Sequence, residues 1–287
     1  MKIEVFFDKT TSTLTYVVWD QTTKDAVVID PVMDYDLSSS TYDYKSVDKI
    51  TNYLKENDLN LHFIMETHVH ADHLTGAQEL KKRIPNAKIA IGNQISKVQE
   101  TFKSFFNLGD EFRTDGSQFD RLLKDNELVE AGSLKFKTLH TPGHTPACCS
   151  YLIKDAVFTG DTLFMPDFGV ARCDFPGGNS DTLFDSVKNK LYSLPNATRY
   201  FTAHDYQPGG RELKYESTIG ESKKNNIHLN ELTTKDEFVI FRTEKDKTLS
   251  APKLLLPSVE INMDAGRFPG PEENNVSYLK IPLRPKK

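Results

Sequence analysis

Three cysteines among 287 residues are too few, and too irregularly spaced, for a disulfide framework. The chain also lacks an apolar run near 18 residues, which argues against a transmembrane helix. It has no cluster of lysine and arginine of the kind that binds nucleic acid, and its formal net charge is −5. Its first residues alternate as a strand does, without the apolar core of a secretory signal. These absences predict a cytoplasmic protein with no nucleic-acid or membrane partner.

The three cysteines are expected to have different surroundings. Cys148 and Cys149 lead into the apolar run 150–153 and are predicted to be small residues that fill a strand. Cys173 lies in a loop flanked by glycine and proline, where it could be exposed and close to an active site.

The chain has enough apolar residues, 38%, for a sizeable core, and they follow alternating strand and helix patterns. The main predicted strands cover residues 13–19, 26–29, 61–65, 134–140 and 199–202, and the main predicted helices cover 46–57 and 182–194, the latter with Ser180 or Asp181 as N-cap. Such alternation predicts a layered α/β sandwich.

The composition changes after about residue 220, where polar and then proline-rich segments follow. We therefore predict a catalytic domain over residues 1–220. Residues 221–287 are predicted to form a short C-terminal extension that packs on this domain and contributes to the substrate mouth or to a subunit contact.

The run THVHADH at residues 67–73 carries three imidazoles and a carboxylate within six residues. Burying such polar groups without partners costs roughly 2–7 kcal/mol each, so they are poor core material. The run follows the apolar stretch 61–65 and precedes a helix-like pattern from Leu74, which predicts a strand-to-helix turn. Nitrogen and oxygen donors at such a turn indicate a transition-metal site.

Three further residues of the same kinds, His144, Asp161 and His204, each follow a predicted strand. Strand ends in an α/β fold can converge on one edge, where sites are built. The candidate ligands are therefore His68, His70, Asp72, His73, His144, Asp161 and His204. The remaining histidines are predicted to lie outside the ligand set, with His62 packed in a strand and His228 in solvent.

The motif HxHxDH at residues 68–73, followed by His144, Asp161 and His204 in that order, resembles the metallo-β-lactamase superfamily over roughly residues 1–215. The resemblance implies an αββα sandwich with a metal site at one edge, between the two sheets. The strings THVHADHLTG, HTPGHTP, FTGD and AHDY look like the persulfide dioxygenases, the family of the ethylmalonic-encephalopathy protein. The loop at 167–178 and the proline-rich tail look closest to a bacterial branch labelled "β-lactamase hydrolase-like".

One loop departs from that resemblance. The mammalian-type pattern reads GCGRTDF, whereas this chain has GVARCDF at residues 169–175. The cysteine lies on the other side of the arginine, so no role of the family cysteine is carried over to Cys173.

The residues alone leave two metal arrangements open. All seven candidates together would hold two metals with Asp161 as the bridge, which is a hydrolytic site. Alternatively, three of them would hold one Fe(II) as a facial triad with three open positions: His68, His144 and Asp161. The other four would then surround the iron and orient its ligands. The resemblance to persulfide dioxygenases favours the single iron.

The resemblance implies one Fe(II) per chain, which uses O₂ to oxidise glutathione persulfide to glutathione and sulfite, in a dimer or higher homo-oligomer. Arg172 is predicted to bind a substrate carboxylate, with a loop salt bridge to Asp174 as the alternative. Tyr206 is predicted to donate its hydroxyl toward iron or substrate, with a packed tyrosine as the alternative. These two are the predicted catalytic residues.

Two other functions stay open. A dinuclear zinc hydrolase of a thioester or lactone, similar to glyoxalase II, would use the same ligands, and Thr75 in place of a glycine counts against it. A metal-binding sensor without catalysis would need a closed tetrahedral site, which this ligand set does not predict.

Overall fold

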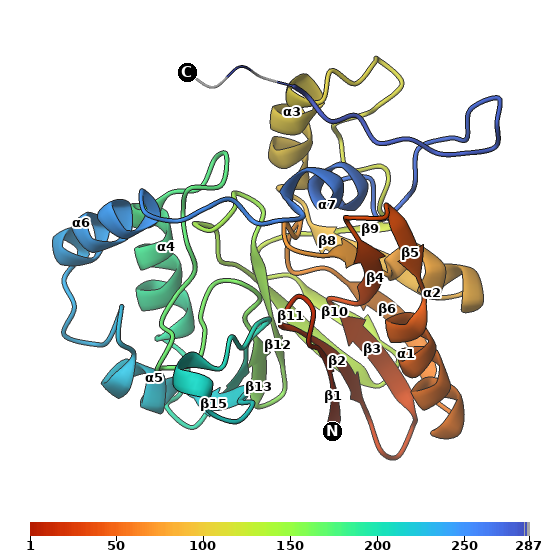
Figure 1. The fold of residues 1–287 in the computed structure, drawn as a ribbon. Helices are drawn as coiled ribbons and strands as arrows, with labels where there is room; N and C mark the ends of the chain where they lie inside the picture. Colours follow the sequence, from red (N-terminus) through yellow and green to blue (C-terminus); the bar gives the residue numbers. More distant parts are fainter. Residues whose placement is uncertain (284, 286–287) are drawn as a thin grey trace.

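The computed structural model describes residues 1–283 and 285, which form two six-stranded sheets that face each other, with helices on both outer sides (Figure 1). The first sheet has the order β1-β2-β3-β6-β8-β9 and the second β10-β11-β12-β13-β14-β15. A small sheet, β5-β4-β7, accompanies the first. The layers therefore run α, β, β, α, which confirms the predicted sandwich.

The strands of the first sheet and of the small sheet are β1 (Lys2–Asp8), β2 (Thr13–Trp19), β3 (Asp25–Ile29), β4 (Val32–Asp36), β5 (Thr41–Asp43), β6 (Asn60–Met65), β7 (Leu74–Thr75), β8 (Lys88–Gly92) and β9 (Arg121–Leu123). Those of the second sheet are β10 (Leu128–Ala131), β11 (Leu134–His140), β12 (Cys149–Ile153), β13 (Ala156–Phe158), β14 (Arg199–Phe201) and β15 (Glu216–Thr218). The helices are α1 (Lys45–Glu56), α2 (Ala77–Arg83), α3 (Ile95–Phe105), α4 (Ser180–Asp185), α5 (Ile219–Asn225), α6 (Lys235–Asp246) and α7 (Leu255–Asn262), with a π-helical segment at Ser186–Leu191 and a 3₁₀ turn at Pro208–Gly210.

Large aromatic side chains fill the space between the two sheets. Tyr16 from the first sheet packs edge-on against Phe158 and Phe201 of the second, with ring centroids 5.1 and 5.6 Å apart. Phe136 lies between Phe63 and Tyr151 in the same layer. All residues of β2 and β3 are buried, because helices cover one face of the first sheet and the second sheet covers the other.

The outer face of each sheet is covered by helices. Ile50 of α1, Leu80 of α2 and Phe102 of α3 belong to one apolar cluster on the first sheet. Leu183 of α4 and Phe238 of α6 belong to another on the second sheet. Three apolar layers thus hold the four structural layers together.

Strand direction brings four loops to one edge of the sandwich. In the first sheet, β3, β6 and β8 are parallel. In the second, β11 and β13 each pair antiparallel with β12 and therefore point the same way, and β14 is parallel to β13. A bridge between Thr13 and His204 joins the two sheets at this edge. The loops that follow β6, β11, β13 and β14 are therefore neighbours.

Two predicted elements differ from the structure. The predicted helix at 182–194 is a short α4 followed by the π-helical segment, and its N-cap is Asn179, whose side chain accepts a hydrogen bond from the Thr182 amide at 2.8 Å. The helix expected from Leu74 begins at Ala77. Leu74 instead lies in β7, because residues 74–75 pair with β4 before the helix starts.

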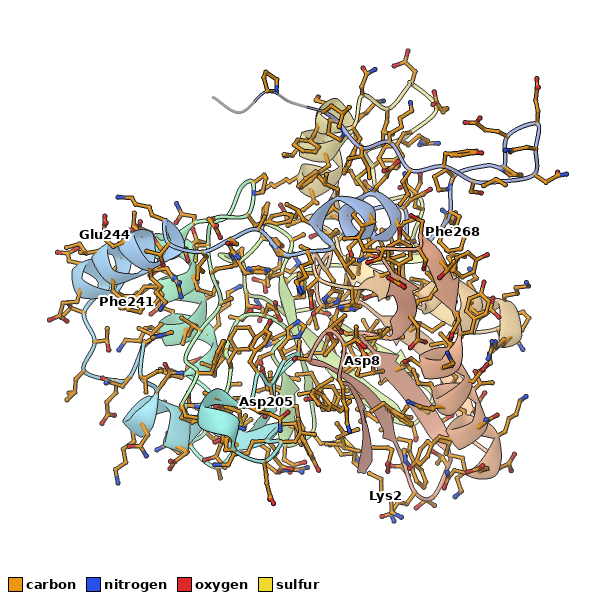
Figure 2. All side chains as sticks on the ribbon, in the orientation of Figure 1. Lys2, Asp8, Asp205, Phe241, Glu244 and Phe268 are labelled. Carbon is orange, nitrogen blue, oxygen red and sulfur yellow. The ribbon has the colours of Figure 1, made fainter. Side chains whose placement is uncertain are left out.

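The C-terminal residues lie against both halves of the sandwich. The predicted boundary at residue 220 falls within α5. Val259 of α7 and Met263 belong to the apolar cluster of the first sheet, whereas α6 packs on the second. Phe241 on α6 and Phe268 beyond α7 accordingly lie on opposite sides of the molecule (Figure 2). Within the described part of the chain, no helix is long and apolar enough to cross a membrane.

Replacing Phe136 with Ala should lower the free energy of unfolding by about 3–5 kcal/mol, because a fully buried ring between the sheets is lost. The control is Leu128→Ala on the neighbouring strand, where the side chain is 62% exposed, and its effect should stay within about 0.5 kcal/mol. Urea unfolding of both variants measures the difference. Equal effects would contradict this packing.

Candidate metal centre

The loop that carries the histidine run, residues 66–73, is held by the buried carboxylate of Asp30. Asp30 directly follows β3 and accepts hydrogen bonds from the Thr67 amide at 2.7 Å and the Thr67 hydroxyl at 2.8 Å. The same carboxylate lies 3.0 Å from Nε2 of His70. Since this stretch has little regular pairing, the carboxylate supplies partners that a sheet would otherwise provide.

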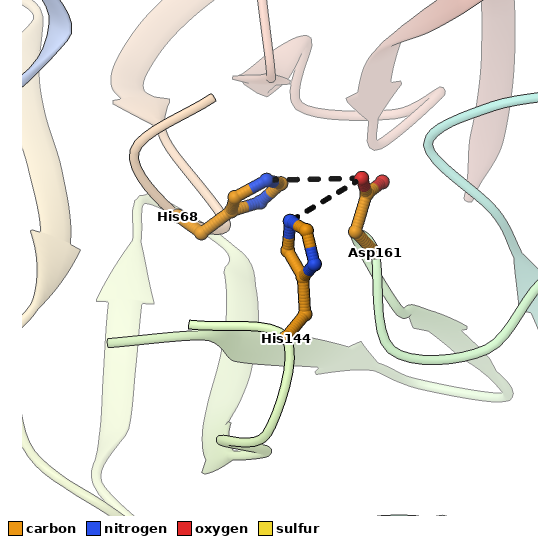
Figure 3. A group of neighbouring side chains, drawn as sticks. All are labelled: His68, His144 and Asp161. Atoms are coloured by element: carbon orange, nitrogen blue, oxygen red, sulfur yellow. Dashed lines mark ion pairs between the residues drawn. The ribbon is translucent and has the colours of Figure 1, made fainter. Parts of the chain in front are cut away.

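Three of the predicted ligands come together at this edge (Figure 3). His68 follows β6, His144 follows β11, and Asp161 follows β13. Oδ2 of Asp161 lies 3.9 Å from Nε2 of His68 and 3.8 Å from Nε2 of His144. Donor atoms that share one ion at roughly 2.0–2.2 Å lie about 3–3.5 Å apart, so a small contraction would suffice.

The two histidines of this triad are oriented by bonds to their other ring nitrogen. Nδ1 of His144 lies 2.8 Å from the carbonyl of Arg172, so this nitrogen carries the proton. Nδ1 of His68 lies 3.0 Å from the hydroxyl of Thr67, which spends its own hydrogen on Asp30. Burial and the neighbouring imidazoles also hold the pKa of His68 well below its usual value. Both Nε2 atoms therefore present a lone pair to the site.

A second group lies beside the triad. Oδ2 of Asp72 is 3.3 Å from Nε2 of His204, and its other oxygen is 3.6 Å from Nδ1 of His73. Nε2 of His204 is also 3.3 Å from Oδ1 of Asp161, which joins the two groups. Nδ1 of His204 lies 3.2 Å from the carbonyl of Ser12. Burial opposes ionisation of Asp72, but the positive charges of His204 and His73 outweigh it and hold its pKa well below the usual range.

His70 differs from the other candidates because two carboxylates hold its Nε2. Asp30 lies 3.0 Å and Glu66 3.4 Å from this atom, and all three side chains are buried. Although burial works against a charged imidazole, Asp30 and Glu66 raise the pKa of His70 well above its usual value. The ring stacks between His68 and His73, with centroids 4.1 and 4.2 Å away.

Within residues 1–283 and 285, several buried nitrogen and oxygen atoms of these side chains, which could bind a metal, have no hydrogen-bond partner. They are Nε2 of His68, Nδ1 of His70, Nε2 of His73, Nε2 of His204 and Oδ1 of Asp161. Each unpaired buried atom costs about 1–3 kcal/mol, and these five lie together. Nitrogen and carboxylate donors with free lone pairs in one place fit a transition metal, so the residues present suit such an ion.

Arg172 is occupied by its own loop. The guanidinium forms two parallel bonds of 2.5 Å with Asp174 and donates to the carbonyl of Ser250 at 2.8 Å. The sequence left open a loop salt bridge between Arg172 and Asp174, and the structure contains it, so a substrate carboxylate would have to displace Asp174. The residue still serves the site through its carbonyl, which orients His144.

Tyr206 lies beside the second group, with its ring stacked on that of His204 at 5.5 Å and tilted against that of Phe168 at 4.8 Å. The residue is 46% exposed, so it lies at the border between the site and solvent. Arg211 anchors this segment through Asp205, at 2.7 Å. The predicted hydroxyl contact with iron or substrate remains a prediction.

Two remaining histidines lie outside the ligand groups. His62 is half-buried and satisfied by Asp25, 2.6 Å away. Nε2 of His140 lies 3.3 Å from the carbonyl of Leu123. His140 lines a cavity of about 580 Å³ behind the loop of His144, and the ligand groups do not line this cavity. This cavity is therefore separate from the candidate metal centre.

One expectation was wrong. His228, expected in solvent, is half-buried, packs on Phe241 of α6 at 4.7 Å and accepts a hydrogen bond from the Val170 amide. Cys173, for which the loop sequence allowed exposure, is 9% exposed, and burial raises the pKa of its thiol well above its usual value. Cys173 shares an apolar cluster with Phe238 of α6, and the polar composition after residue 220 did not predict how this helix packs.

Several supporting residues escaped the sequence interpretation. Asp30 could have been found, since it follows an apolar strand as Asp161 does. Glu66 could also have been found, since it is an acidic residue that directly follows the apolar strand β6. Ser12 acts through its carbonyl, which no sequence pattern reveals. Asn262 is nearly 190 residues from the loop that it contacts, so only the fold brings it there.

Comparison with known proteins agrees with this geometry. A family model described as "Metallo-beta-lactamase superfamily" matches residues 9–204, which include all seven candidate ligands. The "Glyoxylase B2" of Dictyostelium discoideum is 48% identical over 98% of this chain and 97% of its own length. A "Beta-lactamase hydrolase-like protein" of Agrobacterium fabrum is 45% identical over 98% of this chain and 64% of its own.

Persulfide dioxygenases are similar at greater distance. The human "Persulfide dioxygenase ETHE1, mitochondrial" is 30% identical over 70% of this chain and 66% of its own length. The crystal structure of ETHE1 from Myxococcus xanthus superimposes with a TM-score of 0.75 at 31% identity, covering 93% of this chain and all of that one.

The half-buried position of His228 predicts a distinct titration. Burial, followed by the charges of Arg242 and Lys245, lowers its pKa to about 4, against about 6.5 in an unfolded chain. Because the unfolded chain takes up the proton first, stability should fall as the pH drops from about 6.5 toward 4. His228→Gln should remove this part of the slope, as measured by urea unfolding across that range. An NMR titration that places the ring near 6.5 would contradict its burial.

Proposed function

The chain belongs to the metallo-beta-lactamase superfamily of enzymes, and from this premise we propose that it is a persulfide dioxygenase with one Fe(II) held by His68, His144 and Asp161. One observation carries the proposal. Two imidazoles with fixed lone pairs and one carboxylate oxygen converge from three separate loops, which is the donor set of a facial triad. The likeness to persulfide dioxygenases, in sequence and in structure, supports iron as the metal.

An iron held in this way would supply adjacent open positions where the terminal sulfur of a persulfide and O₂ meet. The chain's own residues would fix the geometry of that meeting. The carbonyl of Arg172 and the hydroxyl of Thr67 hold the two imidazole rings, and Nε2 of His204 lies 3.3 Å from the second oxygen of Asp161. Oδ2 of Asp161 faces both rings, so it is the oxygen placed to bind the ion.

Carboxylates already lie beside the histidines of the second group, so the proposed single ion does not need these histidines as ligands. Asp72 pairs with His73 and His204, and Nε2 of His70 is held by two buried carboxylates. Under this proposal these residues brace the triad and do not bind a metal of their own.

The proposed substrate is a small thiol persulfide, for which glutathione persulfide is the expected carrier. The balanced reaction is GSSH + O₂ + H₂O → GSH + SO₃²⁻ + 2 H⁺, in which the terminal sulfur is oxidised and O₂ is reduced. A peptide-like carrier brings carboxylates, and Arg172 would receive one only by releasing Asp174. The homo-oligomeric state and the cytoplasmic location remain predictions.

A second candidate is a dinuclear zinc hydrolase of a thioester or lactone. The observation in its favour is that Nδ1 of His70 and the Nε2 atoms of His73 and His204 are buried without hydrogen-bond partners in the described residues, as ligands of a second ion would be. The name of the Dictyostelium relative, "Glyoxylase B2", points in the same direction.

Metal content and O₂ uptake separate the two candidates. Protein purified without oxygen should contain about one iron per chain, consume O₂ on addition of glutathione persulfide, and form sulfite in equal amount. Two zinc ions per chain, no O₂ uptake and turnover of a thioester would establish the hydrolase instead.

His144→Ala should remove the bound iron and abolish persulfide-dependent O₂ uptake, since one of the three proposed ligands is lost. The matched control is His140→Ala, four residues earlier, whose ring lies on the carbonyl of Leu123 and should leave the iron in place. His73→Ala tests the metal count, because a single-iron site keeps its ion and a dinuclear site loses one. Elemental analysis of the three variants decides.

A further inference from the structure

We propose that the C-terminal helices are a working part of the metal centre, in which Asn262 of α7 positions the loop 66–73 and Asp246 of α6 positions the loop that orients His144. The inference rests on the proposed metal site but is independent of the reaction catalysed there. Both residues lie beyond the region that the family model matches, residues 9–204.

Asn262 uses both ends of its side chain on the ligand loop. Its Nδ2 donates to the carbonyl of His70 at 2.9 Å and to that of His73 at 2.8 Å, and its Oδ1 accepts from the Thr75 amide at 2.9 Å. The residue is 4% exposed, so water does not easily replace these bonds. Both amide hydrogens are spent on the loop, which leaves this side chain a single orientation.

The position of Asn262 is itself fixed by packing. Val259, one turn earlier on α7, is fully buried in the apolar cluster of the first sheet, as is Met263. The carbonyl of Met263 also accepts a hydrogen bond from Gln99 of α3 at 2.9 Å. A side chain on such a rigid element can set backbone positions within the tolerance that a metal site requires.

The bonds from Asn262 bracket the part of the run from which the candidate ligands project. The carbonyls of residues 70 and 73 are the two that it binds, and Asp72 lies between them. Without these bonds the segment would keep its contact to Asp30 only at the Thr67 and His70 end. The rings of His70 and His73 would then sample more positions, and His70, whose ring centroid lies 4.1 Å from that of His68, would hold this proposed iron ligand less firmly.

Asp246 acts on the opposite side of the site. Its Oδ2 accepts a hydrogen bond from the Cys173 amide at 2.8 Å, and the carbonyl of the preceding Arg172 accepts from Nδ1 of His144. A buried ion pair with Arg242, at 2.6 Å, holds the carboxylate in place. One peptide unit therefore connects α6 to a proposed iron ligand.

The test for Asn262 uses Co²⁺ as the probe on the full-length protein stripped of metal. Asn262→Ala should weaken Co²⁺ binding by about 10–100-fold, measured by competition with a chelator, and should change the visible absorption spectrum of the bound ion. The matched control is Leu256→Ala on the same helix, which loses half-buried apolar contacts with the first sheet's cluster but no bond to the loop. It should lower the melting temperature and leave both the affinity and the spectrum unchanged.

A second variant keeps the test decisive where Asn262→Ala folds poorly. Asn262→Asp preserves the acceptor for Thr75 but removes both donor bonds, so it should weaken Co²⁺ binding to the same degree. Wild-type affinity and spectrum in a folded Asn262 variant, or equal weakening by Leu256→Ala, would overturn the proposal. A protein that binds Co²⁺ as described but oxidises no persulfide would overturn the proposed function and leave this inference standing.

Asp246 is tested by comparing Asp246→Ala with Asp246→Asn. Both variants lose the charge that pairs with Arg242, but asparagine retains an oxygen that can accept from the Cys173 amide. Weaker Co²⁺ binding in the alanine variant, restored by asparagine, is the expected result. Equal affinities in both variants and wild type would remove α6 from the inference.

Discussion

The metal centre depends on the buried carboxylate of Asp30. This carboxylate binds the amide and the hydroxyl of Thr67 and lies against the ring of His70, so one side chain at the end of β3 determines the path of the ligand loop that follows β6. Through the hydroxyl of Thr67 it also decides which nitrogen of His68 carries the proton. The parallel pairing of β3 and β6 is what brings Asp30 to the loop. The chemistry of the site is therefore set by sheet topology and by one desolvated charge.

The sequence predicted the seven candidate ligands and the layered fold because both leave local signals. Histidines and aspartates after apolar runs stand out, and alternation of strands and helices indicates layers. What the sequence did not reveal are contacts made by backbone carbonyls or across long separations, such as those of Ser12 and Asn262. The predicted N-cap of α4 was wrong by one or two residues, because Asn179, Ser180 and Asp181 have similar N-cap preferences. The burial of Cys173 and His228 depends on where α6 packs, which no local pattern determines.

The surroundings of the site are divided between orientation and charge balance. Carbonyl and hydroxyl oxygens direct the rings of His68, His144 and His204, and for His68 and His144 this bond leaves a lone pair on the opposite nitrogen. Carboxylates balance the remaining charge, with Asp30 and Glu66 on His70 and with Asp72 on His204. Arg172 orients His144 through its carbonyl, whereas the sequence predicted that its guanidinium would contact the substrate. A residue's contribution here is often made by its main chain.

The division of the ligands between the two sheets has a consequence for the life of the chain. His68 follows a strand of the first sheet, whereas His144 and Asp161 follow strands of the second, and Asp161 comes 93 residues after His68 in the chain. A growing polypeptide therefore has no complete binding site until β13 has been made and has paired with β12. An ion held by these three residues could be bound only after the two sheets have packed together, and it would then link one sheet to the other.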